Sequence, residues 1–126
     1  MKFTNLFLSV VLFCGASLAH ALDVKPFSQE ALAAAEKSGA PVALHFHADW
    51  CPTCRAQDKA LQSLKSEKGL DLTVLTANYD TETNLKRRFK INTQATFVVL
   101  KGQTEVARLV GDSSVEKIRS ALKAAL

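Results

Sequence analysis

The sequence has 126 residues, of which 48% are hydrophobic and 22% are charged, with a formal net charge of +4 at neutral pH. A chain of this length forms one domain with a modest core, and its ordinary apolar content excludes a disordered protein. The net charge is mild. The dense basic run of Lys86–Arg88 with Lys90 lies on an expected helix, which favours a solvated helix face over a nucleic-acid site.

The first 21 residues have the pattern of a cleaved secretory signal peptide. Lys2 gives a positive start, residues 6–16 are apolar, and the small residues Ala19 and Ala21 flank a cleavage point. The apolar stretch is shorter than the roughly 20 residues that a membrane-spanning helix needs. We therefore expect residues 1–21 to be removed, which leaves a domain of residues 22–126 in the periplasm or outside the cell.

Helix formers and a short apolar run predict the first elements after this leader. Ser28 is a suitable N-cap and Gly39 a suitable stop for a helix rich in alanine and glutamate. The run begun by Pro41 is mostly apolar, as in a strand buried on both faces. A longer helix then carries apolar residues at helical spacing and is closed by Gly69. The expected elements are a helix over residues 29–37, a strand over 41–47 and a helix over about 52–67.

The second half of the chain predicts a strand, a short helix, a hairpin and a terminal helix. The short helix begins at Asp80 and Thr81 and turns Leu85 and Phe89 inward, and the hairpin turns at Gly102. The apolar stripe of the terminal helix comprises Val115, Ile118, Leu122 and Leu126. The expected ranges are strands over residues 72–79, 96–100 and 105–110, a loop over 91–95 and a helix over 114–125. This order predicts an α/β fold with a central mixed sheet flanked by helices on both faces.

Two cysteines, Cys51 and Cys54, stand where the first expected strand gives way to the second helix. A disulfide between them would close too short a loop to stabilise a fold, so we interpret the pair as reactive rather than structural. At the helix N-terminus, free backbone N–H groups and the helix dipole favour a thiolate on Cys51, and Pro52 suits the first helical turn. Cys51 is therefore the expected exposed nucleophile. Cys54, one turn along and buried, resolves the mixed disulfide.

A metal site is the alternative interpretation of this spacing. A structural zinc site needs a second pair of ligands, and the processed chain has no further cysteine. A copper- or zinc-binding module would instead combine Cys51 and Cys54 with either His45 or His47, since thiolates and imidazoles suit both metals. The residues that flank the cysteines decide in favour of redox chemistry.

Residues 46–55 resemble the active-site segment of the thioredoxin superfamily; their sequence is Phe-His-Ala-Asp-Trp-Cys-Pro-Thr-Cys-Arg. Residues 48–51 are especially similar to the thioredoxin-like domains of bacterial periplasmic reductants. The resemblance covers almost the whole mature chain. It implies a thioredoxin-like fold, a disulfide that alternates with a dithiol, and no bound cofactor. It also implies a substrate groove, whose residues here are Trp50, Pro52, Thr53, Gln94, Ala95 and Gly111.

Two histidines depart from the superfamily pattern. His45 stands where thioredoxins bury an aspartate beneath the second cysteine, and Thr76 stands where they often carry the lysine that partners it. We expect His45 to titrate near neutrality and to act as a proton acceptor for Cys54. His47 replaces a tryptophan on the same strand face, so both imidazoles are expected on the side of the cysteine pair.

Ala95 is a further departure, because the superfamily places a cis-proline there, facing the cysteines. A cis bond before a residue other than proline costs about 3–4 kcal/mol, so the bond between Gln94 and Ala95 is expected to be trans. The loop must then take a different path, which favours a wider groove and a narrow protein partner.

We therefore predict an exported thiol-disulfide oxidoreductase that acts on protein disulfides or dithiols. A membrane-bound or soluble thiol protein is its expected redox partner. Similarity to periplasmic reductants favours the reducing direction, and a disulfide-forming oxidant is the alternative. We expect a monomer with no nucleic-acid partner.

Overall fold

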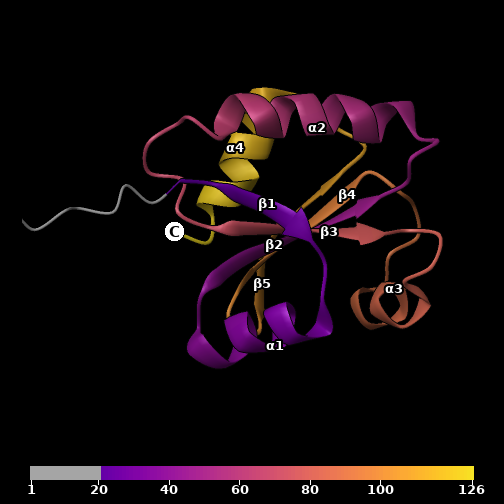
Figure 1. Cartoon of the computed structure of the whole chain (residues 1–126), viewed down its shortest axis with the longest axis horizontal. Coiled ribbons are helices and arrows are strands. Elements are labelled where there is room, and N and C mark those ends of the chain that lie inside the picture. The colour runs from indigo at the N-terminus through magenta and orange to yellow at the C-terminus, as the bar shows by residue number, and fades with distance from the viewer. Residues whose placement is uncertain (1–20) are drawn as a thin grey trace, which may run out of the picture.

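The computed structural model describes residues 21–126, so the expected leader lies outside the described residues except for Ala21. The described elements are β1 Asp23–Pro26, α1 Gln29–Ser38, β2 Pro41–His47, α2 Pro52–Leu64, β3 Thr73–Asn78, α3 Thr83–Phe89, β4 Thr96–Lys101, β5 Thr104–Val110 and α4 Val115–Lys123 (Figure 1). Among these helices, none is long and apolar enough to cross a membrane.

The strands form one mixed sheet in the order β1-β3-β2-β4-β5. β1 and β2 both pair parallel with β3, whereas β4 pairs antiparallel with β2 and with β5. The central place of β2 explains its mostly apolar sequence, because a strand with neighbours on both edges and helices on both faces has little contact with water. The prediction of a strand buried on both faces is confirmed.

Helices cover both faces of this sheet, as the order of elements predicts. α2 and α4 lie on one side and α1 and α3 on the other (Figure 1). Successive side chains of β2 alternate between the two layers, so Ala43 packs in the core with α2 and α4, and Phe46 packs with α1 and α3. His45 and His47 share the face of Ala43 and contact α2, which confirms their predicted side.

Local capping signals place the helix ends. The Ser28 side chain accepts a hydrogen bond from the Ala31 amide at the start of α1, and Gly39 ends that helix with a φ of 72°. Ser114 caps α4 in the same way by accepting from the Lys117 amide. Both serine caps sit where the sequence predicts a helix to begin.

The basic run of α3 lies in its last turn, where positive charge complements the negative end of the helix dipole. Lys86 places its ammonium 4.1 Å from the centre of the Tyr79 ring. Arg88 forms an ion pair with Glu36 of α1. Two residues of the basic run therefore make contacts within the molecule.

Strand β1 was not predicted from the sequence. Of its four residues only Val24 is half-buried, and the others are exposed, so neither an alternating nor a continuous apolar pattern is present. The strand exists because its backbone pairs with β3, from Asp23 opposite Thr73 to Pro26 opposite Thr76. Long-range pairing of this kind leaves no local signal.

The predicted end of α2, the predicted start of α3 and one predicted core residue are wrong. Helix α2 ends at Leu64 rather than near residue 67. Helix α3 begins at Thr83, because Asp80 lies in a turn in which its amide donates to the Asn78 side chain. Leu126 is 48% exposed and does not join the stripe of α4, where the buried Ala125 takes its place.

Two glycine turns meet at the end of the sheet opposite the cysteine pair. Gly102, with a φ of 61°, turns the chain from β4 into β5, and its amide donates to the Ala40 carbonyl. A Cβ on Gly102 would lie 3.3 Å from the Cα of Gly39. The hairpin turn therefore rests directly on the turn that ends α1.

Candidate active site

The cysteine pair lies at the start of α2, directly after the turn that follows β2. Cys51 is the N-cap residue, and its sulfur accepts a hydrogen bond from the Cys54 amide at 3.1 Å. Pro52 occupies the first helical position, as predicted. An N–H donor and the positive end of the helix dipole both stabilise negative charge on the Cys51 sulfur.

The predicted exposure of Cys51 is wrong. Cys51 is 1% exposed and Cys54 is completely buried, and both are free thiols in this structure. Cys51 is covered because Ala48 and Ala95 pack against the two cysteines, and Tyr79 packs against this cluster. A substrate must therefore reach the sulfur by displacing or threading between neighbouring groups.

Cys54 differs from its partner in its surroundings. Burial, together with a hydrogen bond and charge repulsion from Cys51, raises the pKa of the Cys54 thiol to about 11. Backbone groups of Ala48 and Ala95 act in the opposite direction. Cys54 is therefore a neutral thiol at physiological pH and has to lose a proton before it can attack a disulfide.

The Ala95 loop faces the cysteines on a strained backbone. No peptide bond within residues 21–126 is cis, so the trans bond predicted between Gln94 and Ala95 is confirmed. Ala95 has a φ of 60°, its amide donates to the Phe46 carbonyl at 2.8 Å, and its carbonyl accepts from the Gly111 amide at 2.9 Å. The conformation of this loop therefore depends on a backbone N–H at residue 95.

The remaining groove residues of the resemblance surround the pair at different depths. Pro52 and Gly111 are exposed, whereas Thr53 and Gln94 are half-buried. Gly111 is linked to Ala95 through the backbone hydrogen bond above. The roles of these residues in substrate binding stay predictions.

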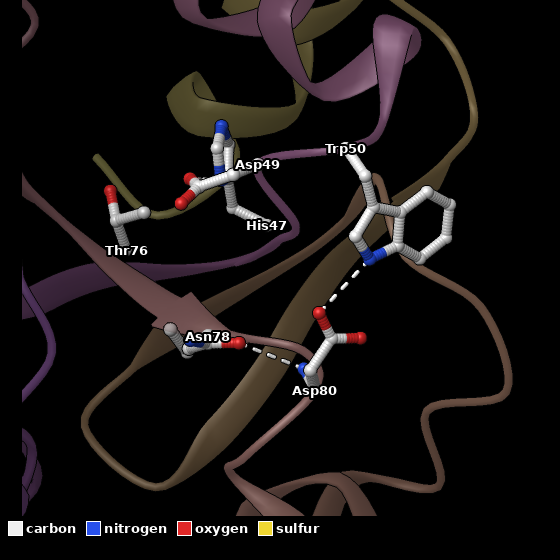
Figure 2. A pocket seen from close by; sticks show the side chains of 7 residues that line it. His47, Asp49, Trp50, Thr76, Asn78 and Asp80 are labelled. Carbon is white, nitrogen blue, oxygen red and sulfur yellow. Dashed lines mark hydrogen bonds and ion pairs between the residues drawn. The ribbon is translucent and has the colours of Figure 1, made fainter.

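Trp50 presents its ring to solvent beside the cysteines. It is 57% exposed, and its indole N–H donates to Asp80 at 2.9 Å. Figure 2 shows this bond at the rim of a pocket of about 180 Å³. The pocket is lined by His47, Asp49, Trp50, Thr76, Ala77, Asn78 and Asp80. The ring is thus exposed directly before Cys51, and the role of Trp50 in substrate binding stays a prediction.

His45 is fully buried on β2, with its ring stacked on Phe97 at 4.2 Å between centroids. Its Nε2 forms a 2.7 Å hydrogen bond with the Oε1 of Gln57, and its Nδ1 lies 4.0 Å from a carboxylate oxygen of Asp58. Burial lowers the pKa of His45 to about 4, although Gln57 and Asp58 act to raise it. The prediction that His45 titrates near neutrality is wrong. Its role as proton acceptor for Cys54 stays a prediction.

Gln57 is the polar residue of the site that sequence reasoning missed. It is fully buried in α2, and its amide nitrogen donates to the carbonyls of Ala95 at 2.9 Å and Asp112 at 3.0 Å. A signal was present, because residue 57 falls on the buried stripe of the helix between Cys54 and Leu61. A glutamine on such a stripe needs buried partners, and here it finds them.

The alternative metal site is not assembled. Among residues 21–126, no group of three or more histidine, cysteine, aspartate or glutamate side chains is placed to hold a metal ion. The Nε2 of His47 instead donates to Asp58 at 2.8 Å, and its Nδ1 lies 3.7 Å from Asp49. Within the described residues, neither histidine therefore joins Cys51 and Cys54 in a group that could hold a metal ion.

The sequence of this chain matches one family of known proteins. The profile of the family described as Thioredoxin matches residues 21–124. The thioredoxin of Mycobacterium tuberculosis is 32% identical over 74 residues, which cover 59% of this chain and 64% of the relative. Chloroplastic thioredoxin Y of Oryza sativa subsp. japonica is 29% identical over 94 residues, which cover 71% of this chain and 56% of the relative. The match thus spans less than two thirds of these relatives.

Solved structures match over a larger share of their length. The crystal structure of Trxlp from Edwardsiella tarda EIB202 has a TM-score of 0.73 and 33% identity, covering 79% of this chain and 98% of that chain. Thioredoxin O2 from Arabidopsis thaliana in the oxidized state has a TM-score of 0.66 and 25% identity, covering 82% of this chain and 92% of that chain. These likenesses confirm the predicted thioredoxin-like fold.

Proposed function

This chain belongs to the thioredoxin family, and we propose that it is a thiol-disulfide oxidoreductase that acts on protein disulfides through Cys51 and Cys54. The observation that carries the proposal is the hydrogen bond from the Cys54 amide to the Cys51 sulfur. It marks Cys51 as the sulfur on which negative charge is stabilised, and the thiolate is the nucleophile in disulfide exchange.

The reaction proceeds in two exchanges. In the first, the Cys51 thiolate attacks one sulfur of a substrate disulfide, the substrate S–S bond breaks, and the other substrate sulfur leaves as a thiolate that takes up a proton. In the second, Cys54 loses its proton and attacks the Cys51 sulfur of the mixed disulfide. The substrate leaves as a dithiol, and the two electrons it gained come from the pair, which ends as a disulfide.

The high pKa of Cys54 makes its deprotonation the step that needs help from the protein. The backbone groups of Ala48 and Ala95 lower this pKa and so favour the charged form of the Cys54 sulfur. While Cys54 stays neutral it cannot attack the mixed disulfide, so the second exchange begins only once this proton is lost.

We further propose that the protein is exported and acts as a reductant. Support comes from the leader pattern of residues 1–21 and from the similarity of residues 48–51 to periplasmic reductants. A reductant needs a supply of electrons, so a second thiol protein, membrane-bound or soluble, has to reduce the pair after each cycle.

The roles of the two cysteines can be tested by trapping. Cys54→Ser removes the resolving thiol, so this variant is expected to accumulate mixed disulfides with a reducible protein such as insulin. Cys51→Ser removes the nucleophile and is the matched control. Non-reducing gels and mass spectrometry measure the adducts. Adducts in the Cys51→Ser protein alone would reverse the two roles, and their absence from both variants would contradict the activity.

The direction is decided by the reduction potential of the pair. Equilibration with glutathione buffers, followed by thiol alkylation, measures it. A reductant is expected near the value of about −270 mV found for thioredoxin, whereas a strong oxidant lies near about −120 mV. A value at the oxidising end would overturn the proposed direction and leave the exchange activity in place.

A further inference from the structure

Gln57 connects three segments that are distant in the sequence. Its side chain, on α2, contacts His45 on β2, the Ala95 carbonyl before β4 and the Asp112 carbonyl before α4. The last two segments belong to the loops that flank the cysteine pair, since Ala95 packs against both cysteines and the Gly111 amide donates to Ala95. One neutral side chain thus holds both loops at once.

The hydrogen-bond pattern fixes the orientation of the Gln57 amide. Both of its nitrogen donors go to carbonyl oxygens, which have no hydrogen to give. The amide oxygen is therefore the atom that faces His45, and it can only accept. It follows that the Nε2 of His45 carries a hydrogen and that the Nδ1 of the neutral ring is bare.

This tautomer gives His45 a use that does not involve transfer of a proton. Its Nε2–H holds the Gln57 oxygen, which in turn directs the two amide hydrogens at the loop carbonyls. Stacking on Phe97 fixes the plane of the ring. With the ring rotated or replaced by an apolar side chain, the amide would lose the donor that sets its orientation.

The loops need such a support because Ala95 is held in the left-handed region, which an L residue seldom adopts. Resting on the proposed function, we propose that Gln57 is a positioning residue of the substrate groove and that His45 acts through it by orienting the Gln57 amide. Gln57 holds the Ala95 loop and the Gly111–Asp112 loop at the spacing in which a substrate chain binds beside the cysteines.

Gln57→Met tests this role, because methionine keeps the length of the side chain and removes all three hydrogen bonds. Gln62→Met is the matched control, since Gln62 is exposed on the same helix. For reduction of a protein disulfide, Gln57→Met is expected to raise KM about tenfold, which corresponds to about 1.4 kcal/mol of binding. Its rate with a small aromatic disulfide, which does not need the groove, changes less. An unchanged KM in the folded variant would overturn the proposal.

Substitution of His45 separates orientation from proton transfer. His45→Gln keeps an N–H donor at the reach of Nε2 but has no group that titrates. His45→Leu has neither an N–H donor nor a group that titrates. Orientation predicts that His45→Leu raises KM as Gln57→Met does and that His45→Gln restores most of the loss. Equal loss of turnover in both variants would overturn the indirect role and assign proton transfer to His45.

The wild-type protein provides a test that does not depend on activity or on the folding of any variant. Nitrogen-15 spectra of the imidazole report which ring nitrogen carries the hydrogen. The structure requires the Nε2–H form for His45 at neutral pH, and an Nδ1–H form would overturn the proposed link. If the wild-type protein reduced no disulfide at all, the proposed function would fail, and this spectrum would still decide whether Gln57 and His45 are joined as described.

Discussion

At Ala95 the backbone has a φ of 60°, a conformation in which an L residue is about 1–2 kcal/mol less stable than in the right-handed region. Hydrogen bonds on both sides of the residue offset this cost. The amide donates to Phe46, and the carbonyl accepts from Gly111 and Gln57. The strain is confined to the loop that touches the cysteines, where it fixes the shape of the site.

Proline at position 95 is expected to destabilise this protein, although the superfamily has proline there. Proline cannot adopt a φ near 60°, and it lacks the N–H that serves Phe46. We expect Ala95→Pro to lose about 2–4 kcal/mol of unfolding free energy, from the buried carbonyl left without its donor and the backbone conflict. Urea denaturation measures the loss.

Ala95→Gly is the control for this experiment. Glycine keeps the N–H and tolerates the positive φ, so its stability should stay within about 1 kcal/mol of the wild type. A proline variant as stable as the wild type would show that the loop has a second path of equal energy.

Buried His45 gives the protein a specific sensitivity to acid. Its pKa is about 4 in the folded state, against 6.5 for the ordinary group, so the unfolded chain binds more protons between these values. The contribution of His45 to stability is complete above pH 6.5 and is lost as the pH falls toward 4. It amounts to about 3 kcal/mol over this window.

His45→Gln removes the titration, so its unfolding free energy should fall less than that of the wild type between pH 6.5 and pH 4. Urea denaturation across this window measures the difference. Parallel curves for the two proteins would mean that His45 has the same pKa in the folded and the unfolded chain.

Among the elements, α1 shows how much depends on a single cap. The Ser28 side chain satisfies the Ala31 amide at 3.1 Å, and only Leu32 of this helix is fully buried. With so little buried surface, the end of the helix matters more to its stability. Ser28→Ala should lower the unfolding free energy by about 1 kcal/mol.

This change should leave disulfide exchange unaffected, because α1 lies on the face of the sheet opposite α2 (Figure 1). Thermal unfolding and an insulin reduction assay measure the two effects. Ser38→Ala, at the other end of the helix, is the control. A loss of activity that is larger than the loss of folded protein would contradict the separation of the two faces.

The elements also show where sequence prediction succeeds. Strand β2 and the two serine caps were predicted because their signals are local: an apolar run, or a side chain that bonds a few residues away. Strand β1 was not, because it depends on pairing with β3. The spacing of Cys51 and Cys54 predicts a reactive pair. No sequence motif predicts a role for Gln57, whose signal is its place on an apolar stripe. The burial of Cys51 depends on Ala95, which is distant in the sequence.

For the molecule as a whole, the order of strands predicts the order in which backbone amides open to water. β2 lies at the centre of the sheet with its interior residues buried, while β5 is an edge strand whose side chains are largely exposed. Amides of residues 42–46 should exchange most slowly, and those of β5 faster by at least about tenfold, because central strands open only with global unfolding. Hydrogen exchange measured by NMR checks this, and slower exchange in β5 would contradict it.

The meeting of Gly39 and Gly102 has a consequence for how sequences of this kind can diverge. A side chain at position 102 would press on the backbone at position 39, at a distance tighter than most real Cβ contacts. The turn at Gly102 can therefore acquire a side chain only if the turn at Gly39 shifts. In related chains the two turns should vary together as a covarying pair, and an insertion that lengthens the hairpin should be accompanied by a changed end of the first helix. The contact between the two turns thus constrains sequence change at the end of the sheet opposite the cysteines, although neither turn takes part in the chemistry.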